Sequence, residues 1–167
     1  MDGIREDRIL KVTFFHHFVA SYSTFLLALI FGAILYLVHF NSSFVVVLGI
    51  FFIIDTLPAL YLHIRYWIKN GGKQYKVDSN GIIQIRKNEE RLIKKSDIQK
   101  IIVTKSASSD KGGIPILSIE SYYFTRVVLK TGEDLVLTCL VSPKIDKVLR
   151  NLNGVLFERK KCFFCFV

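Results

Sequence analysis

The feature that most constrains this chain is an uncharged stretch, Val12–Ile54, which contains no Lys, Arg, Asp or Glu. As a continuous helix it would extend roughly 65 Å, about twice the ~30 Å thickness of a bilayer's hydrocarbon core. Because Asn41-Ser42-Ser43 interrupts the stretch, we predict two antiparallel helices joined by a tight turn. The expected membrane spans cover residues 18–40 and 44–64.

Charge separates an apolar first part from a basic second part. Residues 65–167 carry 20 Lys and Arg against 10 Asp and Glu, whereas residues 1–64 carry only three against four. We therefore predict an N-terminal lead and transmembrane hairpin over 1–68 and a polar domain over 69–167. Within the first part, residues 1–11 are expected to be a charged lead with no fold of its own.

The orientation of the hairpin follows from its flanking charges. The turn between the spans has no Lys or Arg, whereas Arg65, Lys69 and Lys73 follow the second span closely. The positive-inside rule then predicts that both termini are cytoplasmic and that the turn lies outside. His16, His17, His39 and His63 flank the spans, and we interpret them as interfacial anchors.

Asp55 is the one ionisable carboxylate inside the predicted spans. Such a group is costly in lipid and indicates a function by default. One interpretation is a hydrogen-bonded or protonated Asp that fixes the packing of a helix kinked at Pro58. The alternative is a small transport or channel subunit, in which Asp55 lines an ion or proton path between assembled hairpins. We prefer the first, because a lone carboxylate on two helices lacks partners.

The basic part has short alternating runs divided by turn residues, which is typical of strands. The predicted strands cover residues 74–77, 82–87, 91–95, 98–104, 122–130 and 135–141. Ile116–Ile119 is expected to add a strand or to extend the next one, and Lys105–Pro115 to form a mobile loop. Ser142-Pro143 then begins a helix with an apolar stripe. The predicted fold class is α+β, with six or seven strands and a C-terminal helix.

Three segments carry a resemblance to a known family. The start Tyr75-to-Gly81-Ile82, the segment Ser96-Asp97-Ile98-Gln99-Lys100-Ile101 and the junction Leu60–Trp67 resemble bacterial pleckstrin-homology-like domains. The resemblance implies a bent antiparallel β-barrel capped by the C-terminal helix. It also implies the bacterial inner membrane as the location, with a multi-pass topology. Phosphoinositide-binding residues are not carried over, because the first hairpin offers Asp78-Ser79-Asn80, which is not basic.

No arrangement in the sequence supports a reaction. There is no Ser-His-Asp set, glycine-rich phosphate loop or HExxH helix, so we expect no catalytic residues and no cofactor. Cys162 and Cys165 have CxxC spacing, but a zinc site needs about four ligands, and we expect no metal. We assign both cysteines to an apolar C-terminal tail. Three cysteines are too few for a disulfide framework and fit a reducing compartment.

The predicted function is that of a non-enzymatic membrane protein which presents a PH-like binding or scaffolding module at the cytoplasmic face. The expected partners are membrane lipid, an unidentified membrane or cytoplasmic protein, and further copies of the chain as a homo-oligomer. Nucleic acid is not expected, because no aromatic stacking positions lie within the basic cluster. The candidate lipid head-group contacts are basic residues that follow the second span: Arg65, Lys69, Lys73, Arg86, Lys87, Arg91, Lys94 and Lys95.

Overall fold

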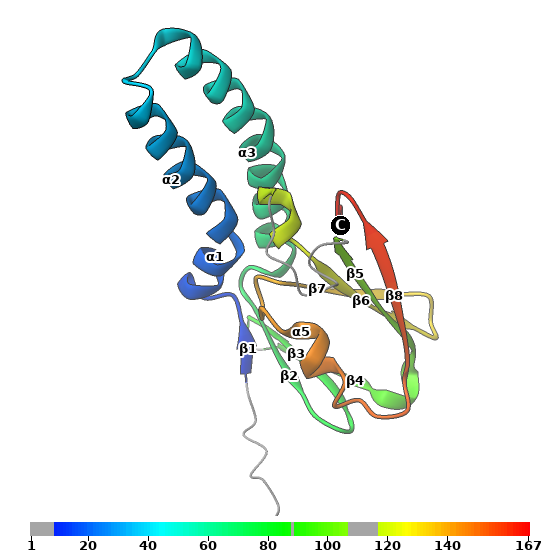
Figure 1. Cartoon of the computed structure of the whole chain (residues 1–167). Helices are drawn as coiled ribbons and strands as arrows, with labels where there is room; N and C mark the ends of the chain where they lie inside the picture. The colour runs from blue at the N-terminus through cyan, green and yellow to red at the C-terminus, as the bar shows by residue number, and fades with distance from the viewer. Residues whose placement is uncertain (1–8, 88, 107–116) are drawn as a thin grey trace, which may run out of the picture.

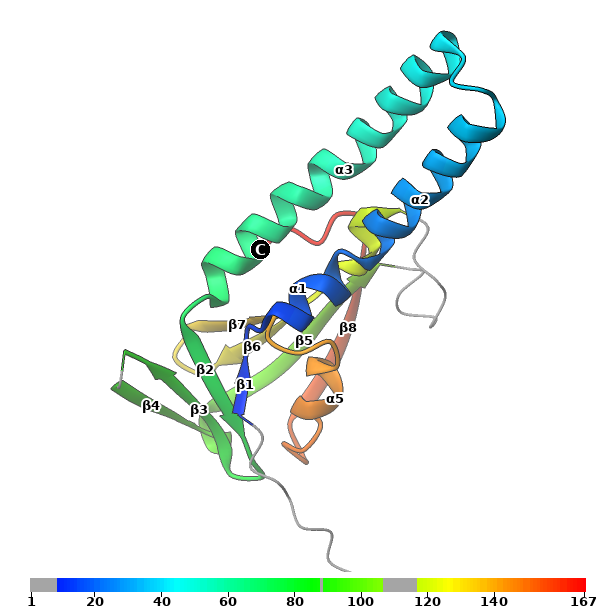
Figure 2. The same ribbon diagram turned by 90° about the vertical axis from the view of Figure 1, so that its left-hand side faces the viewer.

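A helical hairpin projects from a domain of two four-stranded sheets (Figure 1). The computed structural model describes residues 9–87, 89–106 and 117–167. Strand β1 (Ile9–Lys11) comes first and is followed by three helices, α1 (Phe14–Ala20), α2 (Tyr22–Leu37) and α3 (Ser42–Asn70). Figure 2 shows the hairpin standing on one end of the domain, with α1 at its base. The domain is thus mixed α/β, with the hairpin inserted between its first two strands.

The hairpin consists of α2 and α3, which pack side by side. Helix α3 is long and apolar enough to cross a membrane; α1 and α2 meet the same test only as one broken span, bent by 54°. The side chain of Asn41 accepts a hydrogen bond from Ser43 N–H and so caps α3. His39 and Phe40 adopt positive φ angles of 52° and 54° in the turn. The predicted turn is therefore present, but the first helix is broken near its N-terminal end, between α1 and α2.

The first sheet has the order β1-β2-β3-β4 and is antiparallel throughout. Its other strands are β2 (Lys73–Val77), β3 (Gly81–Arg86) and β4 (Glu89–Lys94). Gly81 is required where β3 meets β4, because a Cβ there would lie 2.1 Å from the Ile93 carbonyl oxygen. The prediction that residues 1–11 have no fold is wrong for Ile9–Lys11, which hydrogen-bond to β2.

The second sheet has the order β7-β6-β5-β8. Its strands are β5 (Ile98–Ser106), β6 (Phe124–Leu129), β7 (Asp134–Thr138) and β8 (Leu156–Cys162). Strand β8 pairs with β5 in parallel, so the prediction of an all-antiparallel barrel is wrong. The two sheets remain separate and do not close into a barrel.

The C-terminal part differs from the prediction in its order of elements. Helix α5 covers only Ile145–Leu149 and is followed by β8, so a helix does not end the domain. Gly154, with φ of 84°, allows the chain to turn back into that strand. Cys162 and Cys165 form a disulfide, and the expectation of reduced thiols does not hold for this pair.

A short 3-10 helix, η2 (Ser118–Ser121), precedes β6. The predicted strand over Ile116–Ile119 is therefore wrong for the described residues, because Leu117 lies in a bend and residues 118 and 119 belong to η2. The loop prediction for Lys105–Pro115 lies mostly outside the described residues, and its first two residues belong to β5. Burial of Ser118 and Ile119 explains the difference, because this segment packs against the helices rather than joining a sheet.

Candidate membrane interface

The far half of the hairpin presents an unusually large apolar surface. From Thr24 to Pro58 no side chain is buried, and Leu29, Leu37 and Phe51 are 72%, 73% and 64% exposed. Monomeric soluble proteins rarely expose contiguous apolar patches larger than a few hundred Å². This surface therefore needs an apolar environment or a partner to cover it.

The near half of α3 is docked on the domain by one face. Ala59, Leu62, Tyr66 and Asn70 are buried, and their spacing of three or four residues places them on one side of the helix. Residues on the other side, such as Ile68, which is 72% exposed, face outward. The first half of α3 is thus apolar and exposed, whereas one face of its second half is part of the domain core.

Asp55 marks the level at which the domain first touches α3. Its carboxylate oxygens accept hydrogen bonds of 3.0 and 3.2 Å from the backbone N–H of Ser118, the first residue of η2. On the other side of η2, Ser23 of α2 shares a 2.7 Å hydrogen bond with Ser121. Helix η2 therefore contacts both α2 and α3, and Asp55 has a partner that belongs to the domain.

Asn70 fixes the end of α3 to both sheets. It is fully buried, and its amide donates to Tyr75 OH at 3.0 Å and to the Val136 carbonyl at 2.9 Å. Its side-chain oxygen accepts from Thr138 N–H at 2.9 Å. Burial raises the pKa of Tyr75 to about 12, although its hydrogen bond with Asn70 acts in the opposite direction. A single amide thus ties α3 to β2 and β7.

The histidines at the hairpin base connect helices to the domain. His17 and His63 share a hydrogen bond of 2.7 Å, and the other ring nitrogen of His63 lies 2.9 Å from Tyr122 OH. His16 Nδ1 lies 3.0 Å from the Leu140 carbonyl oxygen. The described part of the chain contains no group of three or more His, Cys, Asp or Glu that could hold a metal ion. His16, His17 and His63 thus have partners at the hairpin base, whereas His39 lies in the turn at the other end of the hairpin.

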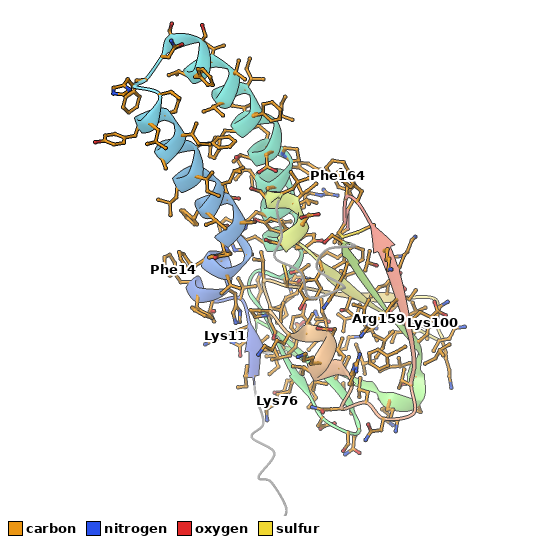
Figure 3. All side chains as sticks on the ribbon, viewed as in Figure 1. Lys11, Phe14, Lys76, Lys100, Arg159 and Phe164 are labelled. Carbon is orange, nitrogen blue, oxygen red and sulfur yellow. A yellow bond between two sulfur atoms is a disulfide. The ribbon has the colours of Figure 1, made fainter. Side chains whose placement is uncertain are left out.

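Exposed aromatic side chains surround the hairpin base, and we call this set the aromatic collar. It comprises Phe14, Phe15 and Phe18 of α1, Tyr61 and Trp67 of α3, and Phe163, Phe164 and Phe166 of the tail. Phe14 is 89% exposed, and Figure 3 shows it on the opposite side of the hairpin base from Phe164. The rings of Tyr61 and Phe166 are 6.1 Å apart. The aromatic collar therefore consists of side chains from three segments that are distant in sequence.

The predicted basic contacts are divided between two places. Lys73 pairs with Arg86 across β2 and β3, and Lys73 Nζ donates to the Lys69 carbonyl at 2.8 Å. The pKa of Lys73 is lowered, first by burial and then by the charges of Arg86 and Lys69. Lys69, Lys73 and Arg86 thus form one basic cluster where α3 leads into β2.

The other predicted contacts lie apart from that cluster or are already paired. Arg91 forms an ion pair with Glu133, and the Arg65 guanidinium lies 6.0 Å from the centre of the Tyr61 ring. Lys94 lies opposite Gly81, at the far end of β4 from Lys87. Lys95 begins a 3-10 turn, η1 (Lys95–Asp97). Alternation along the strands thus separates residues that are neighbours in the sequence.

Sequence reasoning missed the docking of α3 and the contacts of η2. The buried positions Leu62, Tyr66 and Asn70 follow helical spacing, which is the signal that could have revealed an inward face. The partner of Asp55 could not be found in this way. Ser118 contributes a backbone N–H, and every residue type except proline carries that group.

The comparison with protein families supports a PH-like domain. A family model described as PH domain matches residues 5–146, a region that includes β1, the hairpin and most of the domain. No curated protein and no solved structure matches the chain.

Proposed function

The chain belongs to the PH-domain family, and from this premise we propose that it is a non-enzymatic, membrane-anchored binding module. Its hairpin crosses the bacterial inner membrane, and its two sheets are held at the cytoplasmic leaflet with both termini inside. The observation that carries the proposal is the absence of any buried side chain from Thr24 to Pro58. A bilayer covers such a surface without a protein partner.

The depth of insertion follows from a comparison of lengths. The part of α3 from Ser42 to Asp55 extends about 20 Å as a helix, which is shorter than the ~30 Å hydrocarbon core. A hairpin that stopped there would leave its turn, with Asn41 and free backbone groups at the helix ends, inside lipid. Each unsatisfied polar group in lipid costs several kcal/mol. We therefore infer that the turn crosses to the other side.

Full crossing draws the aromatic collar into the leaflet. About 19 residues of α3, from Ser42 to Leu60, then lie in hydrocarbon. Tyr61, Trp67 and the Phe163–Phe166 segment come to the head-group level, where amphipathic aromatic rings are favoured. The domain thereby lies directly on the membrane surface. Its sheets are accessible to cytoplasmic proteins, and its basic residues are accessible to anionic lipid.

The alternative function, a transport or channel subunit, depends on Asp55 lining a path between hairpins. Its carboxylate instead accepts two hydrogen bonds from Ser118 N–H. This contact supports the interpretation in which Asp55 fixes packing, and we do not propose the transport function. The transport hypothesis expects Asp55→Asn to abolish a measurable ion flux through reconstituted protein.

Cysteine labelling of the full chain tests the proposed topology. All three native cysteines are first replaced by Ala, and His39→Cys at the turn or Ser96→Cys on η1 is then introduced. In intact spheroplasts, a membrane-impermeant maleimide is expected to label the turn cysteine at once. The cysteine at residue 96 should react only after lysis, because η1 lies in the cytoplasmic domain.

Two results would contradict the proposal. A turn cysteine that reacts only after detergent is added would indicate a hairpin that stops inside the bilayer. A chain that stays in the supernatant after ultracentrifugation without detergent would show that lipid is not its environment. Both cysteines lie at exposed positions, so neither substitution is expected to disturb the fold.

A further inference from the structure

A groove beside the hairpin base combines an apolar wall with three lysines. It has a volume of about 870 Å³ and lies between β1 and α1 on one side and the segment around α5 on the other. Lys11, Lys144 and Lys147 line it, together with apolar residues that include Phe15 and Val148. Figure 3 shows Lys11 on β1, farther from the hairpin tip than Phe14 of α1. One end of the groove is thus close to the collar and the other carries positive charge.

The lining of the groove contains no carboxylate. All three lysines are exposed, and no ion pair joins any of them to another described residue. Asp146 on α5 is the acidic residue next to them in sequence, but it pairs with Lys105 at 3.0 Å. Among the described residues, no acidic side chain therefore compensates the positive charge of the groove.

A second, smaller hollow continues the groove toward the hairpin. It is lined by Tyr22, Ser121 and Tyr123, among others, and it shares Val19 and Pro143 with the larger groove. Tyr22 begins α2 and is 48% exposed. The two hollows together form a path from the start of α2, along α1, to the three lysines.

We propose that this groove binds one anionic phospholipid, with the phosphate at Lys11, Lys144 and Lys147 and an acyl chain along Phe15 and Val19. The proposal rests on the membrane location proposed above, because α1 must lie at the leaflet surface for a lipid to enter. An apolar wall without the lysines would suit any acyl chain, whereas the lysines select a negative head group. A free phosphate would use only the lysines, so the lipid is the occupant that matches both ends of the groove.

The test is native mass spectrometry of the full chain, delipidated in detergent and titrated with dioleoyl phosphatidylglycerol or dioleoyl phosphatidylcholine. Wild type is expected to retain the anionic lipid at concentrations at least about tenfold lower than the zwitterionic one, since each basic side chain near the head group favours anionic lipid. The K11Q/K144Q/K147Q variant should lose that preference. The matched control K130Q/K160Q/K161Q removes the same charge from exposed positions of the second sheet, on β8 and directly after β6, and should keep the preference.

A second variant, Val19→Trp, tests where the acyl chain binds, because the larger side chain fills the passage shared by the two hollows. It is expected to weaken binding of the anionic lipid about tenfold, whereas glycerol phosphate added in excess should not displace the lipid from wild type. Three results would overturn the proposal. Wild type could retain both lipids equally, or the control variant could lose the preference for anionic lipid as fully as the groove variant does. The third is unchanged binding of the anionic lipid by the Val19→Trp variant. None of these substitutions shortens the hairpin, so intact labelling of the turn cysteine would separate failure of the lipid site from failure of the membrane anchor.

Discussion

The carboxylate of Asp55 accepts two hydrogen bonds from the backbone N–H of Ser118, although the two residues belong to the hairpin and to the domain respectively. This relationship determines how the halves of the molecule are joined. Asp55 lies midway along α3, at the level where η2 contacts the hairpin. The ionisable residue that looks most like an ion site in the sequence is therefore an attachment point for the domain.

The first prediction concerns this attachment. Asp55→Leu is expected to destabilise the docking of η2 by about 1–3 kcal/mol, because it leaves the Ser118 N–H without its acceptor. Hydrogen–deuterium exchange over residues 117–121 should increase by tenfold or more. Asp55→Asn is the matched control, since its side-chain oxygen still accepts one hydrogen bond, and it should change exchange much less. Equal exchange in wild type and the leucine variant would contradict the assignment.

The second prediction concerns Asn70. Asn70→Ala should lower the free energy of unfolding by about 3 kcal/mol or more, because three buried groups lose a hydrogen-bond partner. The shift is measured as the midpoint of thermal or denaturant unfolding in detergent. Asn151→Ala, at an exposed position, is expected to shift the midpoint little. A similar shift in both variants would show that Asn70 does not join α3 to the sheets.

The third prediction uses Trp67, the chain's single tryptophan. It is 55% exposed near the end of α3, and the proposed insertion depth places it at the head-group level. Its fluorescence should therefore be quenched more by lipids brominated near the head group than by lipids brominated near the chain end. Moving the fluorophore with Trp67→Phe and Phe51→Trp should reverse this order. Quenching of Trp67 by neither lipid would contradict the proposed depth.

The fourth prediction concerns alkaline pH. Burial raises the pKa of the Cys139 thiol from its ordinary 9.0 to about 12, against the lowering effect of its backbone hydrogen bonds. Between these values the unfolded chain releases a proton that the folded chain keeps. The free energy of unfolding should therefore fall by about 1.4 kcal/mol for each pH unit above 9.

Cys139→Ala removes this titration, and its unfolding free energy should decline less steeply between pH 9 and 11. The variant is expected to be less stable at neutral pH because it leaves a small cavity, so the slope with pH is the relevant measurement. Tyr75, whose pKa is also raised by burial, contributes in the same direction and leaves a residual slope in the variant. Parallel slopes in wild type and the variant would contradict the burial effect.

Local patterns predicted most of the secondary structure because neighbouring residues carry that information. The turn Asp78-Ser79-Asn80-Gly81 indicates the β2–β3 hairpin, and Asp78 accepts hydrogen bonds from Asn80 N–H and Gly81 N–H there. The strand β8 was missed because its charged segment Glu158–Lys161 does not alternate with apolar residues. Its place beside β5 depends on pairing between distant segments.

The sequence indicated that basic residues contribute to the candidate site, but it did not indicate which of them lie close together. The basic residues were identified by charge alone, and the structure separates Lys94 and Lys95 from the cluster of Lys69, Lys73 and Arg86. The lysines of the groove lie far apart in the sequence, at Lys11 and around α5. No local pattern connects them, because the return of the chain after β7 brings them together.

The sequence by itself determined that a long uncharged segment must be shielded from water and that a basic, strand-rich domain follows it. Hydrophobicity and turn chemistry are properties of short segments, so they can be evaluated without the fold. The tertiary structure decided that β1 completes the first sheet, that η2 contacts both helices of the hairpin and that Asp55 meets Ser118. These contacts depend on segments that are distant along the chain, and their free energy is gained only when the whole domain packs.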